Sequence, residues 1–292
     1  MGCYAAAKLL RIKQVVFDYR DEWEDAIISS VSSQIYKRSY RFLKLLFTKF
    51  YAHSSTVIAV TEAMSQSLSL RGVKNVKVVT NGADTGVFKP YPKNLCRKKL
   101  GLKETDFVLV YNGGLHTYYR LDIVLKALKK VIDKADNLKL IMVGYGSNIK
   151  FILNLSKELG LEERVFYLGS KQDKSELAEI ISACDVGLVP YDSNPLWKTT
   201  IPAKALEYFA CGLPILVTYY KDSLIADFIS VDQVGLRSDP NNIDQLARNI
   251  EKIYNEPSFV AEAAKRAISL VERCFDRNKK AELLLDYLLS GS

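Results

Sequence analysis

Short apolar runs that alternate with amphipathic stretches organise the chain from residue 107 onward. Four runs have the length and composition of buried strands, at 107–111, 138–143, 165–168 and 185–190. Helical patterns accompany them, at 119–134 and 175–184. Because strand–helix alternation builds parallel sheets with right-handed crossovers, we predict a doubly wound α/β domain in this part of the chain.

The same alternation is present earlier in the chain but starts abruptly. A helical pattern over 4–12 leads into an apolar run at 14–18, and further strands are expected at 56–60 and 76–79. An α/β domain normally has earlier strand–helix units, so we expect the first half of this domain to be absent from the chain. The alternative is a small N-terminal cap that is complete in itself.

Turn-forming residues mark a boundary between the two parts. Asn81-Gly82 is a turn signal, and prolines follow at 90 and 92. Three segments are therefore expected: a partial N-terminal domain over 1–88, a C-terminal domain over 89–275, and a C-terminal helix within 276–292 that packs back across the junction.

The stretch 201–216 carries the most distinctive local pattern. Pro202 is placed to open a short apolar helix, Gly212 to end it, and a buried strand follows Pro214. Glu207 is the acid of this otherwise apolar helix, just after a loop. Two interpretations are open: a solvated helix glutamate, or an acceptor for sugar hydroxyls in a cleft.

Composition narrows the class of protein. The 292 residues carry a net charge of +8, which favours anionic partners such as nucleotides, nucleic acid or a lipid surface. Five scattered cysteines without a CxxC pair argue against a disulfide framework or a zinc site and fit a reducing cytosol. Two histidines nearly exclude His-based metal sites and triads. No apolar run approaches the ~20 residues of a membrane span, and we expect a cytoplasmic protein.

A basic and aromatic segment stands out in the first part. The helical pattern over 25–52 contains five lysines and arginines and no acid between Tyr36 and Phe50, with aromatic and leucine residues interleaved. Such a helix can lie on an anionic membrane surface. The alternative, which we prefer for the fold, is a helix packed on the sheet with a solvated basic edge; membrane contact is kept as a hypothesis.

Other candidate chemistry lies at the expected carboxyl ends of strands, where open parallel sheets bind ligands. The charged run from Asp18 to Trp23 follows the first strand, and it is either a site or a loop with local ion pairs. The turns Asn112-Gly113-Gly114 and Gly144-Tyr145-Gly146 follow two later strands. Helix N-termini after such turns can hold phosphate, although neither turn is a full dinucleotide fingerprint or a P-loop.

Several weak motifs occur in a specific order. They are Asp-x-Arg-Asp-x-Trp at 18–23, Asn81-Gly82-Ala83-Asp84, Tyr111-Asn112-Gly113-Gly114, Cys184-Asp185-Val186-Gly187, and Pro202-x-Lys204-x-x-Glu207-Tyr208 with Gly212 and Pro214. In this order the chain resembles the retaining nucleotide-sugar glycosyltransferases of family four, which have the GT-B fold. The resemblance covers essentially the whole chain. It implies two Rossmann-like domains, of which the C-terminal one binds the sugar nucleotide and the N-terminal one the acceptor. No metal is expected, because helix N-termini and basic side chains stabilise the leaving diphosphate.

The resemblance assigns donor-binding residues near 199–207. Glu207 falls at the second glutamate of the family's Glu-x7-Glu motif, which typically holds the ribose. The first glutamate falls at Thr199, which cannot accept two charge-assisted hydrogen bonds. We expect contacts to the donor sugar to shift to Thr200 or to backbone N–H groups around Ile201.

The resemblance also locates the diphosphate and the acceptor. Gly113 matches the family's glycine turn, but Gly114 replaces the usual Arg there, and Tyr119 stands near the usual Lys. Arg120 is then the nearest cation and a candidate for the diphosphate, with Lys204 as a second; the alternative for Arg120 is a surface charge at a helix start.

Arg20 and Asp21 align with the family's His-Asp after a strand and are the candidate catalytic residues. Arg20 would bind an anionic acceptor or donor oxygen and Asp21 would orient it. Because retention in this family is commonly ascribed to same-face attack assisted by the leaving phosphate, no strong general base is required.

These inferences predict a glycosyltransferase that moves a sugar from a nucleotide diphosphate sugar to a glycan or lipid-linked acceptor. We expect no nucleic-acid partner and no metal cofactor. We expect it in the cytoplasm, peripheral on the inner face of the membrane. The alternative is a non-catalytic or split-enzyme sugar-nucleotide-binding subunit that lacks most of its acceptor domain. An epimerase of the same architecture is disfavoured, because that class needs further acid and histidine residues and the chain has two histidines.

Overall fold

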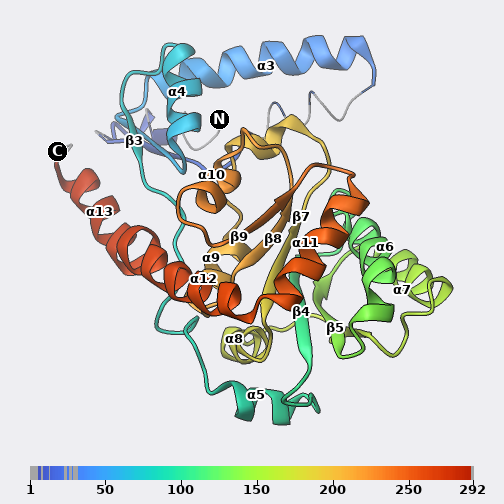
Figure 1. Cartoon of the computed structure of the whole chain (residues 1–292). Helices are drawn as coiled ribbons and strands as arrows, with labels where there is room; N and C mark the ends of the chain where they lie inside the picture. Colours follow the sequence, from blue (N-terminus) through green and yellow to red (C-terminus); the bar gives the residue numbers. More distant parts are fainter. Residues whose placement is uncertain are drawn as a thin grey trace. The chain divides into compact units, whose positions relative to one another are not determined.

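The computed structural model describes residues 6–7, 9–12, 14–22, 25, 28 and 32–290 (Figure 1). The chain forms two compact units. The first comprises Met1–Asn81 together with Arg277–Ser292, and the second comprises Gly82–Asp276. The structure thus divides the chain slightly before the expected boundary at residue 88, and the C-terminal helix α13 (Arg277–Ser290) belongs to the first unit.

The first unit is built on a three-stranded parallel sheet in the order β1-β2-β3. Its strands are β1 (Val16–Tyr19), β2 (Thr56–Ala59) and β3 (Val76–Val78), and its other helices with described bounds are α3 (Gln34–Ala52) and α4 (Glu62–Leu70). Thr61 caps α4 by accepting a hydrogen bond from the Met64 N–H at 3.2 Å. The sequence placed the start of the basic helix at residue 25, but α3 begins at Gln34; much of the preceding stretch, including Trp23, lies outside the described residues.

The second unit is built on a six-stranded parallel sheet in the order β6-β5-β4-β7-β8-β9. Its strands are β4 (Phe107–Gly114), β5 (Leu138–Tyr145), β6 (Val165–Tyr167), β7 (Val186–Pro190), β8 (Ile215–Thr218) and β9 (Gly235–Ser238). The chain winds outward from β4 in one direction and from β7 in the other. The crevice between the carboxyl ends of β4 and β7 is therefore the topological switch point, where open α/β sheets bind ligands.

Helices cover both faces of this sheet (Figure 1). They are α5 (Lys93–Lys99), α6 (Leu121–Val131), α7 (Ile149–Glu158), α8 (Lys174–Ser182), α9 (Ala203–Ala210), α10 (Leu224–Ser230), α11 (Ile243–Asn255) and α12 (Pro257–Leu270), with short helical turns at Ile132–Lys134, Pro195–Thr199 and Val271–Phe275. Successive residues of each strand point to opposite faces. Val108 and Val110 join a core with α8, α9 and α12, whereas Leu109 and Tyr111 join a core with α6, α7 and α11.

Gly113 and Gly114, which follow the strand predicted at 107–111, do not form the turn that the sequence suggested. β4 continues through Gly113 and Gly114 and pairs with β5, so that Gly113 lies opposite Gly144. A Cβ at Gly144 would lie 1.8 Å from the carbonyl oxygen of Gly113. The two strands can therefore continue side by side to their ends only because position 144 is a glycine, which sequence periodicity does not reveal.

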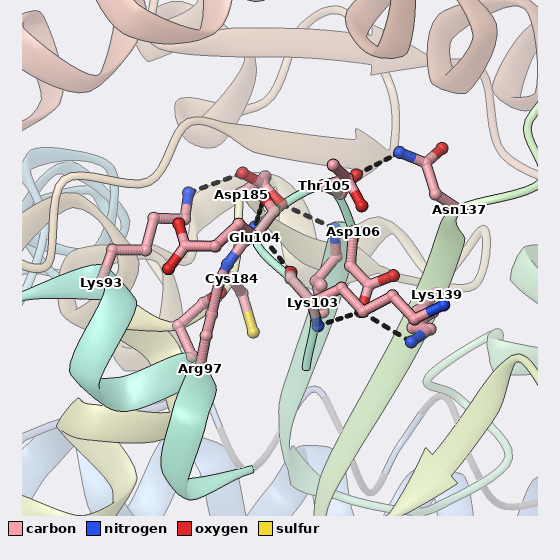
Figure 2. A network of polar contacts seen from close by, with 12 residues as sticks. Lys93, Arg97, Lys103, Glu104, Thr105, Asp106, Asn137, Lys139, Cys184 and Asp185 are labelled. Atoms are coloured by element: carbon pink, nitrogen blue, oxygen red, sulfur yellow. Dashed lines mark hydrogen bonds and ion pairs between the residues drawn. The ribbon is translucent and has the colours of Figure 1, made fainter. Parts of the chain in front are cut away.

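A network of ion pairs joins the amino ends of the central strands (Figure 2). Asp185, just before β7, accepts hydrogen bonds from Lys93 Nζ at 2.6 Å, Arg97 Nη2 at 2.9 Å and the Val108 N–H at 2.7 Å. Asp106, just before β4, is bound by Lys139 Nζ at 2.6 Å. Burial alone would raise the pKa of the Asp106 carboxyl, but the bonds from Lys139 and the backbone outweigh it, so its pKa lies below the usual value.

Candidate functional site

Helix α9 is tied to the end of β4 by two hydrogen bonds. Asn112 Nδ2 donates to Glu207 Oε2 at 2.8 Å, and the Asn112 N–H donates to the Tyr208 hydroxyl at 2.8 Å. Tyr208 is fully buried and lies over Gly187 of β7, where a Cβ would come within 2.2 Å of its ring. These contacts hold the half-buried Glu207 carboxylate at the switch point between β4 and β7.

Lys204 lies one turn before Glu207 and is 8% exposed. Its Nζ is 4.0 Å from the ring centroids of both Tyr111 and Tyr119, a cation–π arrangement on two sides. This Nζ has no hydrogen-bond partner among the residues that the structure describes. Burial lowers the pKa of the Lys204 amine to about 7, against the opposing influence of the Glu207 carboxylate.

The glycines of β4 bring the backbone close to this amine. Gly113 has φ of 125°, and a Cβ there would lie 3.0 Å from Lys204 Nζ. Gly113 itself is exposed, so Lys204 lies directly beneath a stretch of bare backbone. The neighbouring Gly114 carbonyl accepts a hydrogen bond from the Tyr111 hydroxyl, which fixes one wall of the tyrosine cage.

Arg120 lies at the N-cap position of α6, and its side chain is already engaged with neighbouring side chains. Its Nε and Nη2 donate to the two Asp122 carboxylate oxygens at 2.8 and 2.9 Å, and Nη1 donates to Asn241 Oδ1. Burial would raise the pKa of Asp122, but the bonds from Arg120 outweigh it and lower that pKa. The diphosphate role of Arg120 stays a prediction. Of the two candidate cations, Lys204 is the one for which the described residues supply no bonded anion.

The residues expected near the donor sugar precede α9. Thr199 ends the helical turn Pro195–Thr199, and the Thr200 hydroxyl donates to the Trp197 carbonyl at 3.0 Å. Ile201 packs against the core on the α9 side of the sheet. The segment therefore leads directly into the helix that carries Lys204 and Glu207, which begins at Ala203 with Pro202 as its N-cap.

An aromatic cluster that the sequence analysis did not identify lies beside this segment. Tyr191 stacks on Trp197 with centroids 4.9 Å apart, and Tyr119 lies 5.6 Å from Tyr191. The Trp197 indole donates to Asp192 Oδ1 at 2.7 Å. The cluster joins the loop before α6 to the turn before α9, so it positions the Tyr119 wall of the Lys204 cage.

The candidate catalytic residues lie in the first unit, on its own sheet. Arg20 and Asp21 follow β1 and border a pocket of about 280 Å³, lined also by Phe17, Asp18, Tyr19, Phe47 and Tyr51. Arg20 Nε bonds Asp18 Oδ2 at 2.8 Å, and its Nη1 bonds Asn81 Oδ1 at 3.0 Å. The local ion pair that the sequence suggested is present, between Arg20 and Asp18. The catalytic role of Arg20 and Asp21 stays a prediction.

Two partners of the site were missed by sequence reasoning. Asn112 was treated as part of a turn, although it holds Glu207 from a position 95 residues away. Tyr111 was treated as a strand residue, although its ring faces Lys204. The Asn-Gly-Gly motif lies beside Lys204 and Glu207, but no local pattern indicates which distant side chains meet there.

Several curated proteins share part of this chain's sequence. It is 26% identical over 226 residues to the D-inositol 3-phosphate glycosyltransferase of Rhodococcus opacus, covering 74% of this chain and 49% of the relative. It is 30% identical over 145 residues to the N-acetyl-alpha-D-glucosaminyl L-malate synthase of Bacillus anthracis, covering 50% of this chain and 36% of the relative. The chain thus spans about half, or less, of the length of these relatives.

Several solved structures share the fold of this chain. Anabaena HepE in complex with UDP-glucose superimposes with a TM-score of 0.77 at 21% identity, covering 99% of this chain and 75% of HepE. The sucrose-phosphate synthase of Thermosynechococcus elongatus gives a TM-score of 0.77 at 20% identity, covering 99% of this chain and 72% of that one. These similarities confirm the α/β, GT-B-like fold class expected from the sequence. The profile described as "Glycosyl transferases group 1" matches residues 92–270, so the chain belongs to that family.

Proposed function

We propose that this chain takes part in transferring a sugar from a nucleoside diphosphate sugar, and that the donor binds to the second unit at the switch point between β4 and β7. The observation that carries this proposal is the Glu207 carboxylate, which Asn112 holds at 2.8 Å one turn from the buried amine of Lys204, an amine without a bonded anion among the described residues. A carboxylate suits ribose hydroxyls, which are donors, and an amine suits phosphate.

Each part of the donor then has a counterpart in the site. Glu207 accepts hydrogen bonds from the ribose hydroxyls, and Lys204 offsets the charge of the diphosphate. The exposed backbone at Gly113 and Gly114 lets the phosphates approach closely. Thr199, Thr200 and the backbone at Ile201 contact the donor sugar. UDP-glucose, which HepE binds, is the first donor to test.

On the acceptor side, we propose that Arg20 binds an anionic oxygen and that Asp21 orients the acceptor, in the pocket after β1. A guanidinium suits this role because it recognises phosphate and carboxylate oxygens in a fixed geometry. The names of two relatives include anionic small molecules, D-inositol 3-phosphate and L-malate. An acceptor of that kind therefore stands beside the glycan or lipid-linked acceptor as a candidate, and transfer assays with both kinds distinguish them.

The test is a calorimetric titration of the chain and its Glu207→Ala variant with a panel of nucleotide sugars. We expect the variant to lose about tenfold to a hundredfold in affinity, since hydrogen bonds to a charged group contribute about 1.5–3 kcal/mol. The matched control is Glu179→Ala on α8, which removes a surface ion pair with Lys99 and should leave donor affinity unchanged. Equal affinity of the parent chain and Glu207→Ala would refute the assignment.

The alternative is a donor-binding subunit without transferase activity. It is favoured by the fact that the whole proposed donor site is made by the second unit alone. Donor binding without hydrolysis or transfer to any tested acceptor would support it, whereas transfer by the chain itself would exclude it.

We also propose that α3 contacts an anionic membrane surface. Its exposed residues include Ile35, Phe42 and Leu45, and the exposed cations Arg38, Arg41 and Lys49 recur on the same stripe at helical spacing. Among the described helices, none has the length and hydrophobicity to cross a bilayer. Pelleting with anionic vesicles at low salt tests the contact. Replacing Arg38 and Arg41 by Gln should abolish pelleting, and failure of the parent chain to pellet would overturn the proposal.

A further inference from the structure

Lys204 is a buried amine to which none of the described residues contributes a bonded anion. The groups that face it come from three directions: Glu207 from its own helix, Tyr111 from β4, and Tyr119 from the loop before α6. Asn112 Oδ1, at the same end of β4, is likewise buried without a hydrogen-bond partner among the described residues. The imidazole of His116 lies beside Gly114, where a Cβ would come within 2.9 Å of its ring.

Such an environment disfavours the charged form of an amine. Removing an ammonium from water is costly unless an anion and hydrogen-bond acceptors replace the water. Two aromatic faces compensate for only part of that loss. The pKa of Lys204 is accordingly lowered to about 7, because burial outweighs the attraction of Glu207. Near and above neutral pH a large share of the empty sites therefore holds a neutral amine.

We propose that the diphosphate of the donor supplies the missing anion, and that each donor bound brings with it one proton for Lys204. The proton comes from the solvent buffer and adds to the lone pair of Nζ. The resulting ammonium donates to a phosphate oxygen across the bare backbone of Gly113. This inference rests on the proposed donor site, and it adds that donor affinity is coupled to pH through one named residue.

The coupling has a definite direction. Below the pKa of the empty site Lys204 is already protonated, so binding takes up no proton and affinity does not change with pH. Above it, binding must first recruit a proton, so affinity falls by up to about tenfold for each pH unit. In UDP-glucose each phosphate carries one ester and the shared anhydride, so the charge of the diphosphate does not change over this range and contributes none of the effect.

The experiment is a calorimetric titration with UDP-glucose in buffers of different ionisation enthalpy, at pH about 8.5 and about 6. We expect uptake of about one proton per donor at the higher pH and almost none at the lower. Lys204→Met and Lys204→Gln cannot take up this proton, so both should bind more weakly and without the buffer dependence. The test uses one apolar and one polar variant, so that the measurement can still be made if one of them fails to fold.

Two controls separate Lys204 from other groups. Lys252→Met changes an exposed lysine on α11 and should leave both affinity and proton uptake as in the parent chain. His116→Gln removes the neighbouring imidazole and should leave the uptake at pH about 8.5 unchanged. Proton uptake that is absent in the parent chain, or that persists in the Lys204 variants, would overturn the inference while leaving the donor site in place. If no nucleotide sugar binds at any pH, both the proposed function and this inference fail.

Discussion

Buried charges at the two ends of the six-stranded sheet have opposite surroundings. At the amino end, Asp185 is bonded to Lys93, Arg97 and a backbone N–H, so the nearly buried Arg97 has its opposite charge in contact (Figure 2). At the carboxyl end, Lys204 is also buried, and within the part of the chain that the structure describes it has two tyrosine rings in place of a bonded carboxylate. A satisfied network fixes structure, whereas an unsatisfied charge leaves binding energy available for a ligand.

The same comparison separates the two candidate cations of the site. Arg120 is bound by both oxygens of Asp122 and by Asn241, so a phosphate would have to compete with these partners. No side chain in the described ranges competes in this way for Lys204. Position in the sequence favoured Arg120, but the contacts favour Lys204, because what a cation can bind depends on what already occupies its donors.

The largest change in the free energy of unfolding is expected for a substitution at the amino end of the six-stranded sheet. Asp185→Ala leaves the guanidinium of Arg97, with 5% of its side chain exposed, without its carboxylate. Removing one partner of a buried pair destabilises by about 3–5 kcal/mol, and urea denaturation should show a loss of that size. Asp244→Ala, which breaks an exposed pair with Lys130, is the matched control and should change stability little. If both variants had similar stability, the buried pair of Asp185 and Arg97 would contribute no more than the exposed pair, contrary to this prediction.

At the carboxyl end of the sheet, we expect a substitution to raise the free energy of unfolding instead of lowering it. Lys204→Met removes a charge that folding penalises, so near pH 6 the variant should be more stable than the parent by about 1–3 kcal/mol. The pKa of Lys204 is about 7 when folded, below its unfolded value, so between these two values the unfolded chain binds more protons. The parent therefore gains stability relative to the variant as pH rises from about 7 toward 10. Denaturant midpoints across this range measure the difference, and a gap that widens with pH would sink the prediction.

The smallest of these effects is a loss of donor affinity on replacing Asn112, the residue that orients the Glu207 carboxylate. Asn112→Ala removes the 2.8 Å bond to Glu207 but leaves the backbone bond to Tyr208, so the helix should keep its place. We expect donor affinity to fall by about fivefold to tenfold, the cost of one lost hydrogen bond. Asn255→Ala, at the end of α11, controls for a general effect of removing an amide. Affinity equal to that of the parent would show that Glu207 needs no such support.

Much of the second unit could be predicted from the sequence. Strands buried on both faces need continuous apolar residues, so β4, β5 and β7 were recognisable. β9 was not predicted, because Gly235–Ser238 contains an arginine and a serine and is too short to show a period. The extension of β4 through Gly113 was missed for a different reason: it depends on pairing with Gly144, a contact between distant segments.

The sequence by itself determined the family, the parallel alternation of strands and helices, and the place of Glu207 and Lys204 on one short helix. These follow from local patterns and from residues in a fixed order. Only the tertiary structure decided that Asn112 holds Glu207, that Tyr111 and Tyr119 enclose Lys204, and that Arg120 is engaged by Asp122 and Asn241. The physical reason is that the strength and availability of a charge depend on the groups packed around it, and the crossovers of the sheet bring most of those groups from distant parts of the chain.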